Sequence, residues 1–451
     1  MTVDARNTTT GAAIPVANAL PAAADVRAPA FLGPRIVALA ALANLLSSAV
    51  TFGAYGNFIE PVAATFGVAR STIGFGASFT VLALGVAAPF VGRWLDQGRA
   101  RSMMATGAAV TGIGLILLSR AEQLWQASIA FVGLVCIGAA IFGAVPSMAL
   151  TTNWYARRRG LALGLTVAGG TFATFLAPVS AQALIDAYGW RTAAGVFGVW
   201  TLLVAVPLFA LFVIGRPEEV GQRPDGDPPY SPKEAPKEAP KEVGGEASIR
   251  EPVFEGMRET GELARDPRLW LLAFGFGLVM TSPIVLMGLL VEFGRDLGFS
   301  PQQSAVFFAA MVPFSLLGKV VIGGLADVAP LKPSIVMIVL VNMLVWLIFL
   351  FEPGYPAFLA TGALYGIGIG GAAPVHGVAT ARCFGRANFG RANGIGAMAA
   401  IPLLAGASAL SHFLEGATGS YAMGFMVQIG LLLIGGLLLA FVRFPSQAES
   451  A

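Results

Sequence analysis

The chain has 451 residues, of which 56% are hydrophobic and 12% are charged, and its formal net charge is +3. Soluble globular domains carry roughly 25% charged residues, so this composition excludes a soluble domain built around one buried core. The apolar residues fall in repeated runs of about twenty, each long enough to cross a hydrocarbon layer of roughly 30 Å as a helix. The basic residues cluster in the short loops between these runs, which indicates membrane topology and argues against nucleic-acid binding.

Twelve apolar runs predict twelve transmembrane helices, six on each side of a polar linker. The helices are expected at residues 33–58, 72–92, 102–119, 125–150, 161–184, 192–214, 268–291, 303–323, 333–351, 356–379, 394–413 and 422–442. The predicted organisation is a disordered cytoplasmic tail at 1–30, six-helix bundles at 31–214 and 268–444, a cytoplasmic linker at 215–267 and a cytoplasmic tail at 445–451. The tail at 1–30 lacks the charged-then-apolar pattern of a secretion signal.

The linker at 215–267 is rich in Pro, Lys and Glu, repeats the unit KEAP, and cannot bury a core. It is expected to be a flexible tether with a short surface helix near 254–264; a regulatory docking role is the alternative. If the linker is cytoplasmic, the short loops on its side hold ten basic residues and the opposite loops hold four. These are Arg93, Arg99, Arg101, Arg157, Arg158, Arg159, Lys332, Arg382, Arg386 and Arg391 against Arg70, Arg120, Arg191 and Arg295. The excess places both termini in the cytoplasm and the chain in an inner or plasma membrane.

An internal repeat supports the division into two halves. Glu60 recurs as Glu292, Gly92 and Asp96 recur as Gly323 and Asp327, and Arg159 recurs as Arg391, at offsets of 232, 231 and 232 residues. Repeated halves with a site near the midplane are the architecture of many transporters. Gly362, Gly366 and Gly370, set four apart, predict close helix packing.

The loop after the second run, Gly92-Arg93-Trp94-Leu95-Asp96-Gln97-Gly98-Arg99, resembles the signature of the major facilitator superfamily, and Gly323, Leu325 and Asp327 repeat part of it. The resemblance implies an all-α integral membrane protein of twelve transmembrane helices, arranged as two six-helix bundles with pseudo-two-fold symmetry. An acid that faces a helix N-terminus and nearby bases can act as a gate. We therefore expect Asp96, Arg99, Arg101 and Asp327 to gate the transporter; a purely topological role for these charges is the alternative.

The segment Trp154-Tyr155-Ala156-Arg157-Arg158-Arg159-Gly160-Leu161-Ala162-Leu163-Gly164 and the five residues after it are similar to the signature that opens helix 5 in the monocarboxylate transporter family. The bacterial branch of that family includes oxalate/formate exchangers. The acidic glycine-rich motif that opens helix 1 in the family is absent, because this chain has Phe31-Leu32-Gly33-Pro34-Arg35. The resemblance covers about residues 31–444 and implies transport of a small organic anion by a monomer.

Lys319 lies inside the eighth run, and an intramembrane charge is a functional candidate because it costs about 3 kcal/mol to insert. It stands where the family carries the cation that binds the substrate carboxylate, usually an arginine. The alternative is that Lys319 snorkels toward the cytoplasmic face, because Asp327 is only eight residues or roughly 12 Å farther along the helix. Ser315, one turn earlier, shares its face and is expected at the same site.

Helix 1 carries a polar stripe that is expected to face the central cavity, because lipid would leave these groups unpaired. Its members are Asn44, Ser48, Thr51 and Tyr55. Tyr55 and Tyr365, from opposite halves, are expected to clamp a small anion, with plain packing as the alternative. Thr166, Gly170 and Thr174 on helix 5 are weaker candidates for the same cavity.

Three groups are candidates for proton coupling. Glu60 and Glu292 lie near the outer ends of helices 1 and 7, where partial burial would raise a carboxylate pKa; solvated acids at the rim are the alternative. His376 shares a helix face with Tyr365 and could shuttle a proton or bind an anion. The alternative for His376, as for His412, is a neutral histidine packed between helices.

The expected function is secondary active transport of a small organic anion by alternating access. The coupling is expected to be either proton symport or anion exchange. No Lys or Arg occurs in 394–413, where dicarboxylate exchangers of the family carry a second base, so a monocarboxylate is favoured. A porter for a neutral or drug-like solute and a membrane sensor are the alternatives. No phosphate-binding loop, metal-ligand spacing or cysteine pair suggests an enzyme, a metal, a cofactor or a disulfide. Membrane lipid and the anion are the expected partners.

Overall fold

A computed structural model describes residues 30–227 and 258–445 of the chain. The chain divides into two compact units, Met1–Phe31 and Leu32–Ala451, and all described helices belong to the second. The disorder expected for the first tail, for the central part of the linker and for the second tail concerns residues 1–29, 228–257 and 446–451, which lie outside the described residues.

The N-terminal half contains six membrane crossings, three of them interrupted by π-helical turns. The first three crossings are α1 Gly33–Ser48 with η1 Ala49–Gly53 and α2 Tyr55–Phe66, then α3 Arg70–Gly74 with α4 Gly76–Asp96, then α5 Ala100–Ser119. The fourth crossing consists of α6 Leu124–Ser128, η2 Ile129–Cys136, α7 Ile137–Phe142 and α8 Ala144–Trp154. The fifth and sixth crossings together consist of α9 Arg159–Trp200, η3 Thr201–Ala205 and α10 Val206–Phe212.

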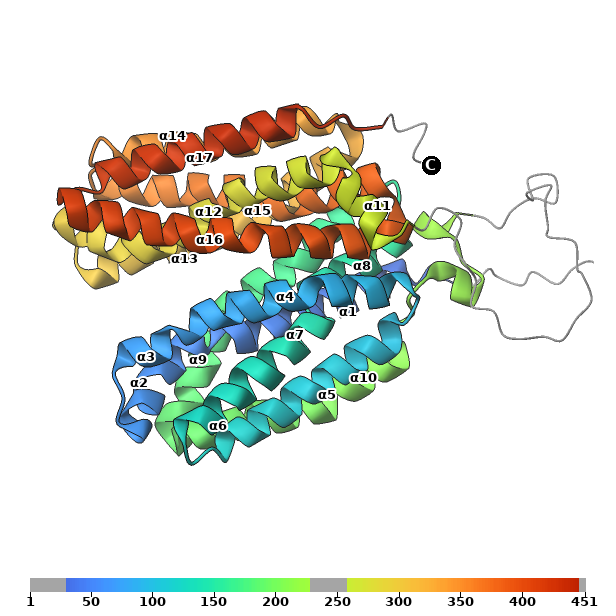
Figure 1. Ribbon diagram of the computed structural model, residues 1–451, viewed down its shortest axis with the longest axis horizontal. Helices are drawn as coiled ribbons and strands as arrows, with labels where there is room; N and C mark the ends of the chain where they lie inside the picture. Colours follow the sequence, from blue (N-terminus) through green and yellow to red (C-terminus); the bar gives the residue numbers. More distant parts are fainter. Residues whose placement is uncertain (1–29, 228–257, 446–451) are drawn as a thin grey trace, which may run out of the picture. The chain divides into compact units, whose positions relative to one another are not determined.

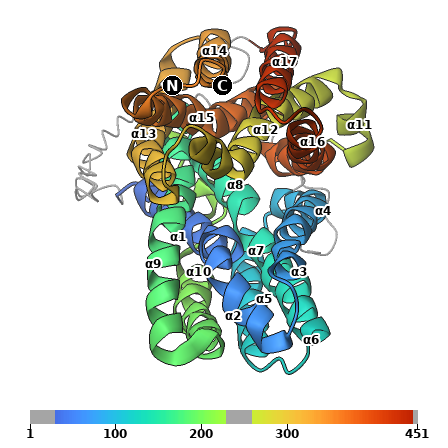
Figure 2. The same cartoon turned by 90° about the vertical axis from the view of Figure 1, so that its left-hand side faces the viewer.

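The C-terminal half is more regular, with one continuous helix for each crossing. These helices are α12 Pro267–Asp296, α13 Pro301–Val328, α14 Leu331–Phe349, α15 Tyr355–Phe384, α16 Phe389–Thr418 and α17 Ala422–Ala440. Figure 2 shows the crossings of the N-terminal half, blue to green, gathered in one bundle and those of the C-terminal half, yellow to red, in the other.

The described part of the chain has eleven helical stretches that are long and apolar enough to cross a membrane, because the fifth and sixth crossings run together from Arg159 to Phe212. A straight helix of these 54 residues would be about 80 Å long, more than twice the thickness of a bilayer core. Gly189 interrupts it with φ 79° and ψ 160°. This backbone conformation suits glycine, and it divides the stretch into two crossings, which makes twelve and confirms the predicted fold.

The two halves meet at one end, which we call the linker end and which carries Asp96, Arg159, Asp327 and Phe389. There α4 packs on α16 and α9 packs on α13, and Figure 1 shows the ribbons of the two halves closest at this end. Two glycine pairs make the approach possible. A Cβ on Gly92 would strike the backbone of Gly390, and a Cβ on Gly160 would strike the backbone of Gly323.

These paired contacts correct one landmark of the repeat. Gly92 and Gly323 are 231 residues apart, as predicted. Gly92 contacts Gly390 and Gly323 contacts Gly160, and these two partners are 230 residues apart. The structural equivalent of Gly160 is therefore Gly390, so the predicted equivalence of Arg159 with Arg391 is displaced by two residues. The two arginines stand at different places in their helices: Arg159 is the first residue of α9, and Arg391 is the third residue of α16.

The glycine stripe on α15 packs against α13 as predicted. A Cβ on Gly362 would crowd Phe307, and one on Gly366 or Gly370 would crowd the backbone near Ser315. Small residues at such a contact let two helix backbones approach closely in a membrane. The stripe therefore sets the position of Ser315, and through it the position of the next turn of α13.

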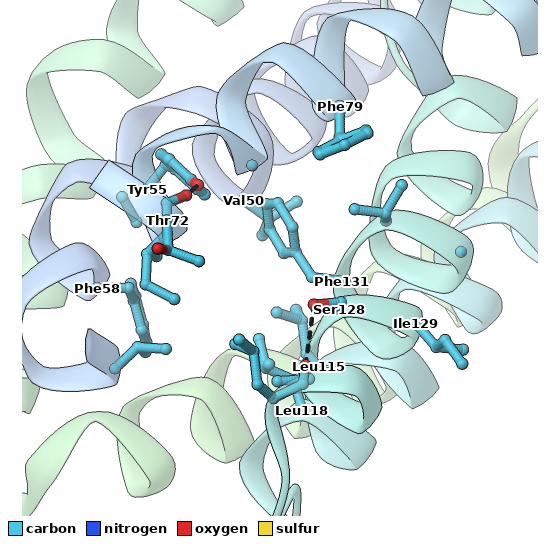
Figure 3. Close-up of a pocket in the computed structure, with 18 of the residues that line it drawn as sticks. Val50, Tyr55, Phe58, Thr72, Phe79, Leu115, Leu118, Ser128, Ile129 and Phe131 are labelled. Atoms are coloured by element: carbon cyan, nitrogen blue, oxygen red, sulfur yellow. Dashed lines mark hydrogen bonds between the residues drawn. The ribbon is translucent and has the colours of Figure 1, made fainter. Parts of the chain in front are cut away.

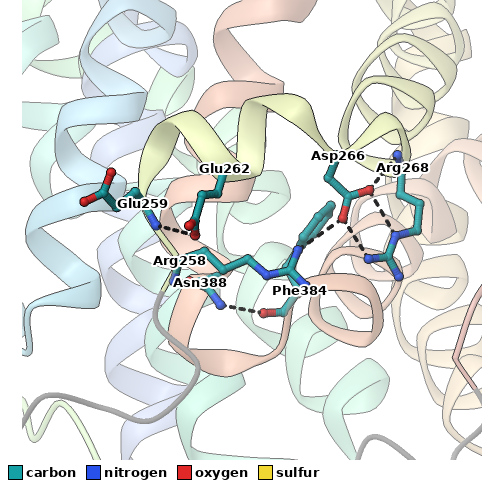
Figure 4. Close-up of polar contacts among 7 residues, drawn as sticks. All are labelled: Arg258, Glu259, Glu262, Asp266, Arg268, Phe384 and Asn388. Atoms are coloured by element: carbon teal, nitrogen blue, oxygen red, sulfur yellow. Dashed lines mark hydrogen bonds and ion pairs between the residues drawn. The ribbon is translucent and has the colours of Figure 1, made fainter.

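The linker is ordered at both ends, which differs from the expectation of a flexible tether from residue 215. Residues 215–227 contain the short 3-10 helices η4 Pro217–Val220 and η5 Pro224–Gly226. At the other end, α11 spans Thr260–Arg265 and overlaps the surface helix predicted near 254–264. The first segment is fixed by tertiary contacts: the indole Nε1 of Trp154 donates to the Ile214 carbonyl at 2.9 Å, and Arg386 pairs with Glu218 at 2.7 Å. The segment from residue 258 is held by hydrogen bonds, as Figure 4 shows. The backbone N–H of Arg258 donates to the Asn388 side chain, and the backbone N–H of Arg268 donates to the Asp266 carboxylate.

Candidate functional site

Asp96 forms one of the contacts between the two halves at the linker end. Its carboxylate, at the last residue of α4, accepts the backbone N–H groups of Gly390 and Arg391, both at 3.0 Å, in the first turn of α16. The first N–H groups of a helix have no partner within the helix, and the helix dipole favours an anion there. Arg391 adds charge, because its Nε lies 3.7 Å from the same carboxylate. The expected contact between this acid and a helix N-terminus is present.

Asp327 makes the equivalent contact on the other side. Its carboxylate, one residue before the end of α13, accepts the backbone N–H of Gly160 at 2.5 Å and that of Leu161 at 2.9 Å, in the first turn of α9. Each half thus supplies one acid and one helix N-terminus. These four hydrogen bonds join the crossings of opposite halves at the linker end.

Arg101, one of the two predicted bases, has a different partner at this end. Arg101 Nε donates to the Val213 carbonyl at 2.7 Å, and Arg99 is exposed just before α5. The guanidinium that reaches Asp96 from the linker belongs to Arg216, whose Nη2 donates to the Asp96 carbonyl oxygen at 3.0 Å. Burial lowers the pKa of Arg216. Contacts among segments this far apart in the sequence leave no local signal, and this is why Arg216 was missed.

Lys319 lies inside a membrane crossing, about three turns before the end of α13, and its side chain is part-buried. Its Nζ donates to the Ser315 hydroxyl at 3.0 Å. Among the described residues no carboxylate forms an ion pair with it. The ammonium points back toward Ser315, one turn away from the linker end, in the direction that helical side chains normally take. The alternative in which Lys319 snorkels toward Asp327 is therefore wrong.

The backbone around Lys319 is held by the other half. A Cβ on Gly164 of α9 would strike the Lys319 carbonyl oxygen, so the two helices touch one turn beyond the contact between Gly160 and Gly323. Gly318, the preceding residue, faces the backbone of Ile367 on α15 in the same way. Lys319 therefore lies beside the contact between the two halves, on the side away from the linker.

The polar stripe of helix 1 turns toward its own half. Asn44 is buried, and its Nδ2 donates to the Thr166 carbonyl at 3.3 Å, while a Cβ on Gly170 would approach Ser48 and Asn44. Thr166 in turn shares a hydrogen bond of 2.7 Å with Thr151. Thr51 donates to the Ser47 carbonyl at 2.7 Å, and Thr174 is exposed. The structure does not support the expectation that this stripe faces the space between the halves.

The structure does not bring Tyr55 and Tyr365 together. The hydroxyl of Tyr55 donates to the Ile73 carbonyl, within the N-terminal half. Tyr365 is fully buried in the C-terminal half, where its hydroxyl lies 3.0 Å from the Ser282 hydroxyl. A regular helical period of 3.6 residues places Tyr55 on the stripe, but η1 is a π-helical turn. A π-helical turn inserts a residue and rotates everything after it, so Tyr55 faces away from Asn44.

The candidates for proton coupling are distributed around the rim and the interior. Glu60 pairs with Arg70 with both side chains more than two thirds exposed, at 68% and 71%, and Glu292 is exposed. The expected partial burial of both acids is therefore wrong in this conformation. His376 lies within α15, its ring 4.8 Å from that of Phe276 on α12. Tyr365 also contacts α12, through Ser282, so the predicted shared face is confirmed.

Two membrane-spanning bundles that are joined at one end by paired contacts between an acid and a helix N-terminus are the architecture of a multi-pass transporter of the two-bundle type. A family model described as Major Facilitator Superfamily matches residues 37–341, which is more than half of the chain. The chain belongs to the Major Facilitator Superfamily. The members of this family that it resembles are transporters and not enzymes.

Curated relatives include monocarboxylate transporters. The chain is 24% identical to monocarboxylate transporter 13 of Bos taurus, over 89% of this chain and 88% of the relative. It is 23% identical to monocarboxylate transporter 12 of Rattus norvegicus, over 76% and 71%. It is also 25% identical to the MFS-type transporter pynF of Aspergillus niger, over 64% and 60%. The resemblance that the helix 5 motif indicated is thus confirmed, and the bacterial branch stays a prediction.

Solved structures show the same fold at low identity. A proton:xylose symporter, XylE, superposes with a TM-score of 0.65 at 14% identity and covers 92% of this chain and 97% of that chain. A bacterial homologue of the iron transporter ferroportin in an outward-facing state superposes with a TM-score of 0.63 at 15% identity, over 90% and 98%. At these identities the likeness concerns the fold alone.

Proposed function

We propose that this chain is a secondary active transporter that carries a small organic anion, a monocarboxylate, by alternating access. The observation that supports this proposal is the state of Lys319. It is a cation inside a membrane crossing whose described partner is a neutral hydroxyl. A buried charge without a counter-charge is costly, and a bound carboxylate would supply that counter-charge.

The chemistry of the site favours one carboxylate and not two. Lysine is a compact point charge with three donors, and it lacks the planar fork with which arginine binds a carboxylate in two places. Ser315 adds one hydroxyl beside it. The predicted span of helix 11, residues 394–413, has no Lys or Arg that could hold a second carboxylate. The similarity to proteins named monocarboxylate transporters supports the same substrate class.

Anion exchange is the mode of coupling that we favour over proton symport. With an anion bound, the Lys319 site is near neutral; empty, it holds an uncompensated charge that would make passage through a closed state costly. Glu60 and Glu292 are exposed, and they lack the burial that would prepare a carboxylate to carry a proton. His376 has no described acid among its partners. Exchange of one anion for another needs none of these groups.

The direction of opening follows from the proposed topology. If both termini and the linker are cytoplasmic, the gates formed by Asp96 and Asp327 close the cytoplasmic side. The conformation is then outward-facing, with Lys319 at the floor of the space between the halves. Rocking of the halves would break both acid contacts and open the opposite route to Lys319.

Counterflow in proteoliposomes tests this proposal. Vesicles loaded with unlabelled lactate, pyruvate, acetate or formate should accumulate the labelled acid without an imposed pH gradient, and Lys319→Ala should abolish accumulation. Lys332→Ala is the matched control, because Lys332 is exposed and its Nζ donates to the Ala440 carbonyl at the linker end; it should retain transport.

Two outcomes would overturn the proposal. Accumulation of an uncharged solute with no acid accepted would favour the alternative of a neutral or drug-like porter. Saturable binding of an acid without trans-stimulated accumulation would favour a membrane sensor. Accumulation that requires an inward pH gradient would keep the substrate class and replace exchange by proton symport.

A further inference from the structure

A cavity of about 540 Å³ lies inside the N-terminal half, at the end opposite the linker end. Its walls come from elements of the same half (Figure 3), namely η1, α2, α3, α4, α5, α6, η2 and α9. Lys319 is on α13 in the other half and is not part of the lining. The cavity is therefore distinct from the site proposed for the anion. Its volume falls in the range of about 300–1,000 Å³ that is typical of small-molecule sites.

The lining has no charged side chain. Its hydroxyl groups are largely committed within the protein: Tyr55 donates to the Ile73 carbonyl, and Ser128 donates to the Leu124 carbonyl at 2.9 Å. A water molecule needs two or more polar partners to remain in a cavity, and apolar cavities instead take up apolar molecules. A charged ligand would find no counter-charge here, so the lining selects an uncharged occupant.

Aromatic rings give the cavity a more specific character. Five of the lining side chains are aromatic: Tyr55, Phe58, Phe79, Phe131 and Phe197. Tyr55 and Phe131 already pack together with ring centroids 5.4 Å apart. Rings attract one another in offset and edge-to-face arrangements beyond the effect of their buried area, and a flexible acyl chain gains nothing from that geometry. The lining therefore favours a ring over a lipid tail.

The cavity can be reached from the surface. Phe79 and Ile129, which line it, are 54% and 59% exposed. Thr72 also lines the cavity and is exposed, and Figure 3 shows it beside Tyr55. Its hydroxyl has no hydrogen-bond partner within residues 30–227 and 258–445. A ligand with an aromatic body and one polar substituent would place the body among the rings and the substituent at Thr72.

We propose that this cavity is a binding site for an uncharged aromatic molecule, separate from the anion site. Two of its walls contain the π-helical turns η1 and η2, which contribute Val50 and the residues around Gly133. Such turns are local insertions that occur often at functional sites. Both turns belong to the same half, so a molecule between them would occupy the interior of one bundle.

Photolabelling tests the site without any transport measurement. The purified protein in detergent is irradiated with a neutral phenyl diazirine, and modified peptides are identified by mass spectrometry. Label is expected on peptides that contain Phe131 and Phe58, and excess naphthalene should remove it. Gly133→Leu should also remove it, because a Cβ there has only Ile129 nearby, at 3.8 Å, and the longer side chain would enter the cavity. Val50→Phe is a second filling variant.

Gly430→Leu is the matched control. Gly430 lies in α17 of the other half, and a Cβ added there would have no atom within 4 Å, so this variant should label as the unchanged protein does. Labelling that persists in both filling variants, or that is absent from these peptides, overturns the site. Labelling by a diazirine-bearing phosphatidylcholine tail that naphthalene fails to displace assigns the cavity to lipid and overturns the aromatic ligand.

The counterflow assay tests whether the cavity is separate from the anion site. Naphthalene should leave the half-saturating anion concentration unchanged. Inhibition that the anion relieves by competition would place the ligand at Lys319 and overturn a separate site. The photolabelling result holds whether or not the substrate proposed above is correct, so the two failures can be told apart.

Discussion

The carbonyl oxygen of Lys319 occupies the place that a Cβ on Gly164 would need. This contact joins the candidate substrate residue in one half to helix α9 of the other, one turn from the contact of Gly160 with Gly323. Closure of the linker end and the position of Lys319 are therefore parts of one packing arrangement. A larger residue at 164 cannot be accommodated unless the two helices separate.

Gly164→Val is expected to shift the protein toward a conformation that is open at the linker end. Spin labels at Trp94 and Val328, which are 48% and 82% exposed on opposite halves, should report a longer distance in the variant. The measurement is pulsed electron resonance after replacement of the buried Cys136 and Cys383 by Ser. Gly430→Val, which meets no neighbour, should leave the distance unchanged. An unchanged distance in Gly164→Val would mean that α9 and α13 can separate locally without opening the gate.

Asp96→Asn and Asp327→Asn should each shift the same equilibrium in the same direction. A charged acceptor at a helix N-terminus contributes about 1–2 kcal/mol when partly buried, and an amide keeps the shape without the charge. A loss of that size changes the ratio of the two conformations about tenfold. The same pair of spin labels measures it.

Asp186→Asn is the control for this pair of variants. Asp186 is exposed at the opposite end and accepts from Gln182 at 2.7 Å, so its neutralisation should not move the label distance. If either gate variant behaves like this control, the charges at the linker end would have only the topological role that the sequence left open.

The fold was predictable because its determinants are local. Apolar runs of sufficient length specify the crossings, and glycines at intervals of four on α15 specify a close helix contact that the structure contains. Asp96 and Asp327 were predictable as acids facing helix N-termini because their position in the repeated motif already placed them at helix ends. The candidate site was predictable only for Lys319 and Ser315, which lie one turn apart on the same helix.

What could not be predicted depends on insertions and on distant contacts. The extra residue of η1 leaves no mark in composition, yet it turns Tyr55 from the face of Asn44 toward Ile73. The order of the first part of the linker comes from Asp225, whose carboxylate accepts the N–H groups of Ala156 and Arg157 at 3.0 and 2.8 Å. The sequence shows the Pro-Asp-Gly turn, but it does not show that the aspartate contacts Ala156 and Arg157, about seventy residues earlier.

Ser282→Ala should destabilise the C-terminal half strongly for so small a change. The Ser282 hydroxyl lies 3.0 Å from that of Tyr365 and accepts from Trp346 Nε1 at 2.8 Å, and all three residues are buried. Each polar group left buried without a partner costs about 1–3 kcal/mol. The melting temperature in detergent should fall, and adding Tyr365→Phe should recover part of the loss. Ser102→Ala, at an exposed hydroxyl, should be neutral; equal stability of Ser282→Ala would mean that water replaces the missing partner.

Asp266 predicts how stability depends on pH at the start of α12. Its side chain accepts from the backbone N–H of Arg268 and from the Arg268 guanidinium, and it pairs with Arg258 at 3.2 Å (Figure 4). The hydrogen bond from Arg268, the backbone N–H and the nearby positive charge hold the pKa of Asp266 below its ordinary value of 3.8, despite its burial. A depressed pKa means that the charged form is favoured by folding. Its contribution is complete above pH 3.8 and is lost as the pH falls through the lower value of the folded state.

Asp266→Asn isolates this contribution, because Asn caps a helix N-terminus about as well as Asp and lacks the charge. The variant should melt at a lower temperature than the unchanged protein at neutral pH, and the difference should shrink only at pH values below 3.8. Asp266→Ala loses the cap as well, so its deficit should persist at every pH. A difference between Asp266→Asn and the unchanged protein that disappears already near neutral pH would show that another titrating group, and not Asp266, governs the acid response.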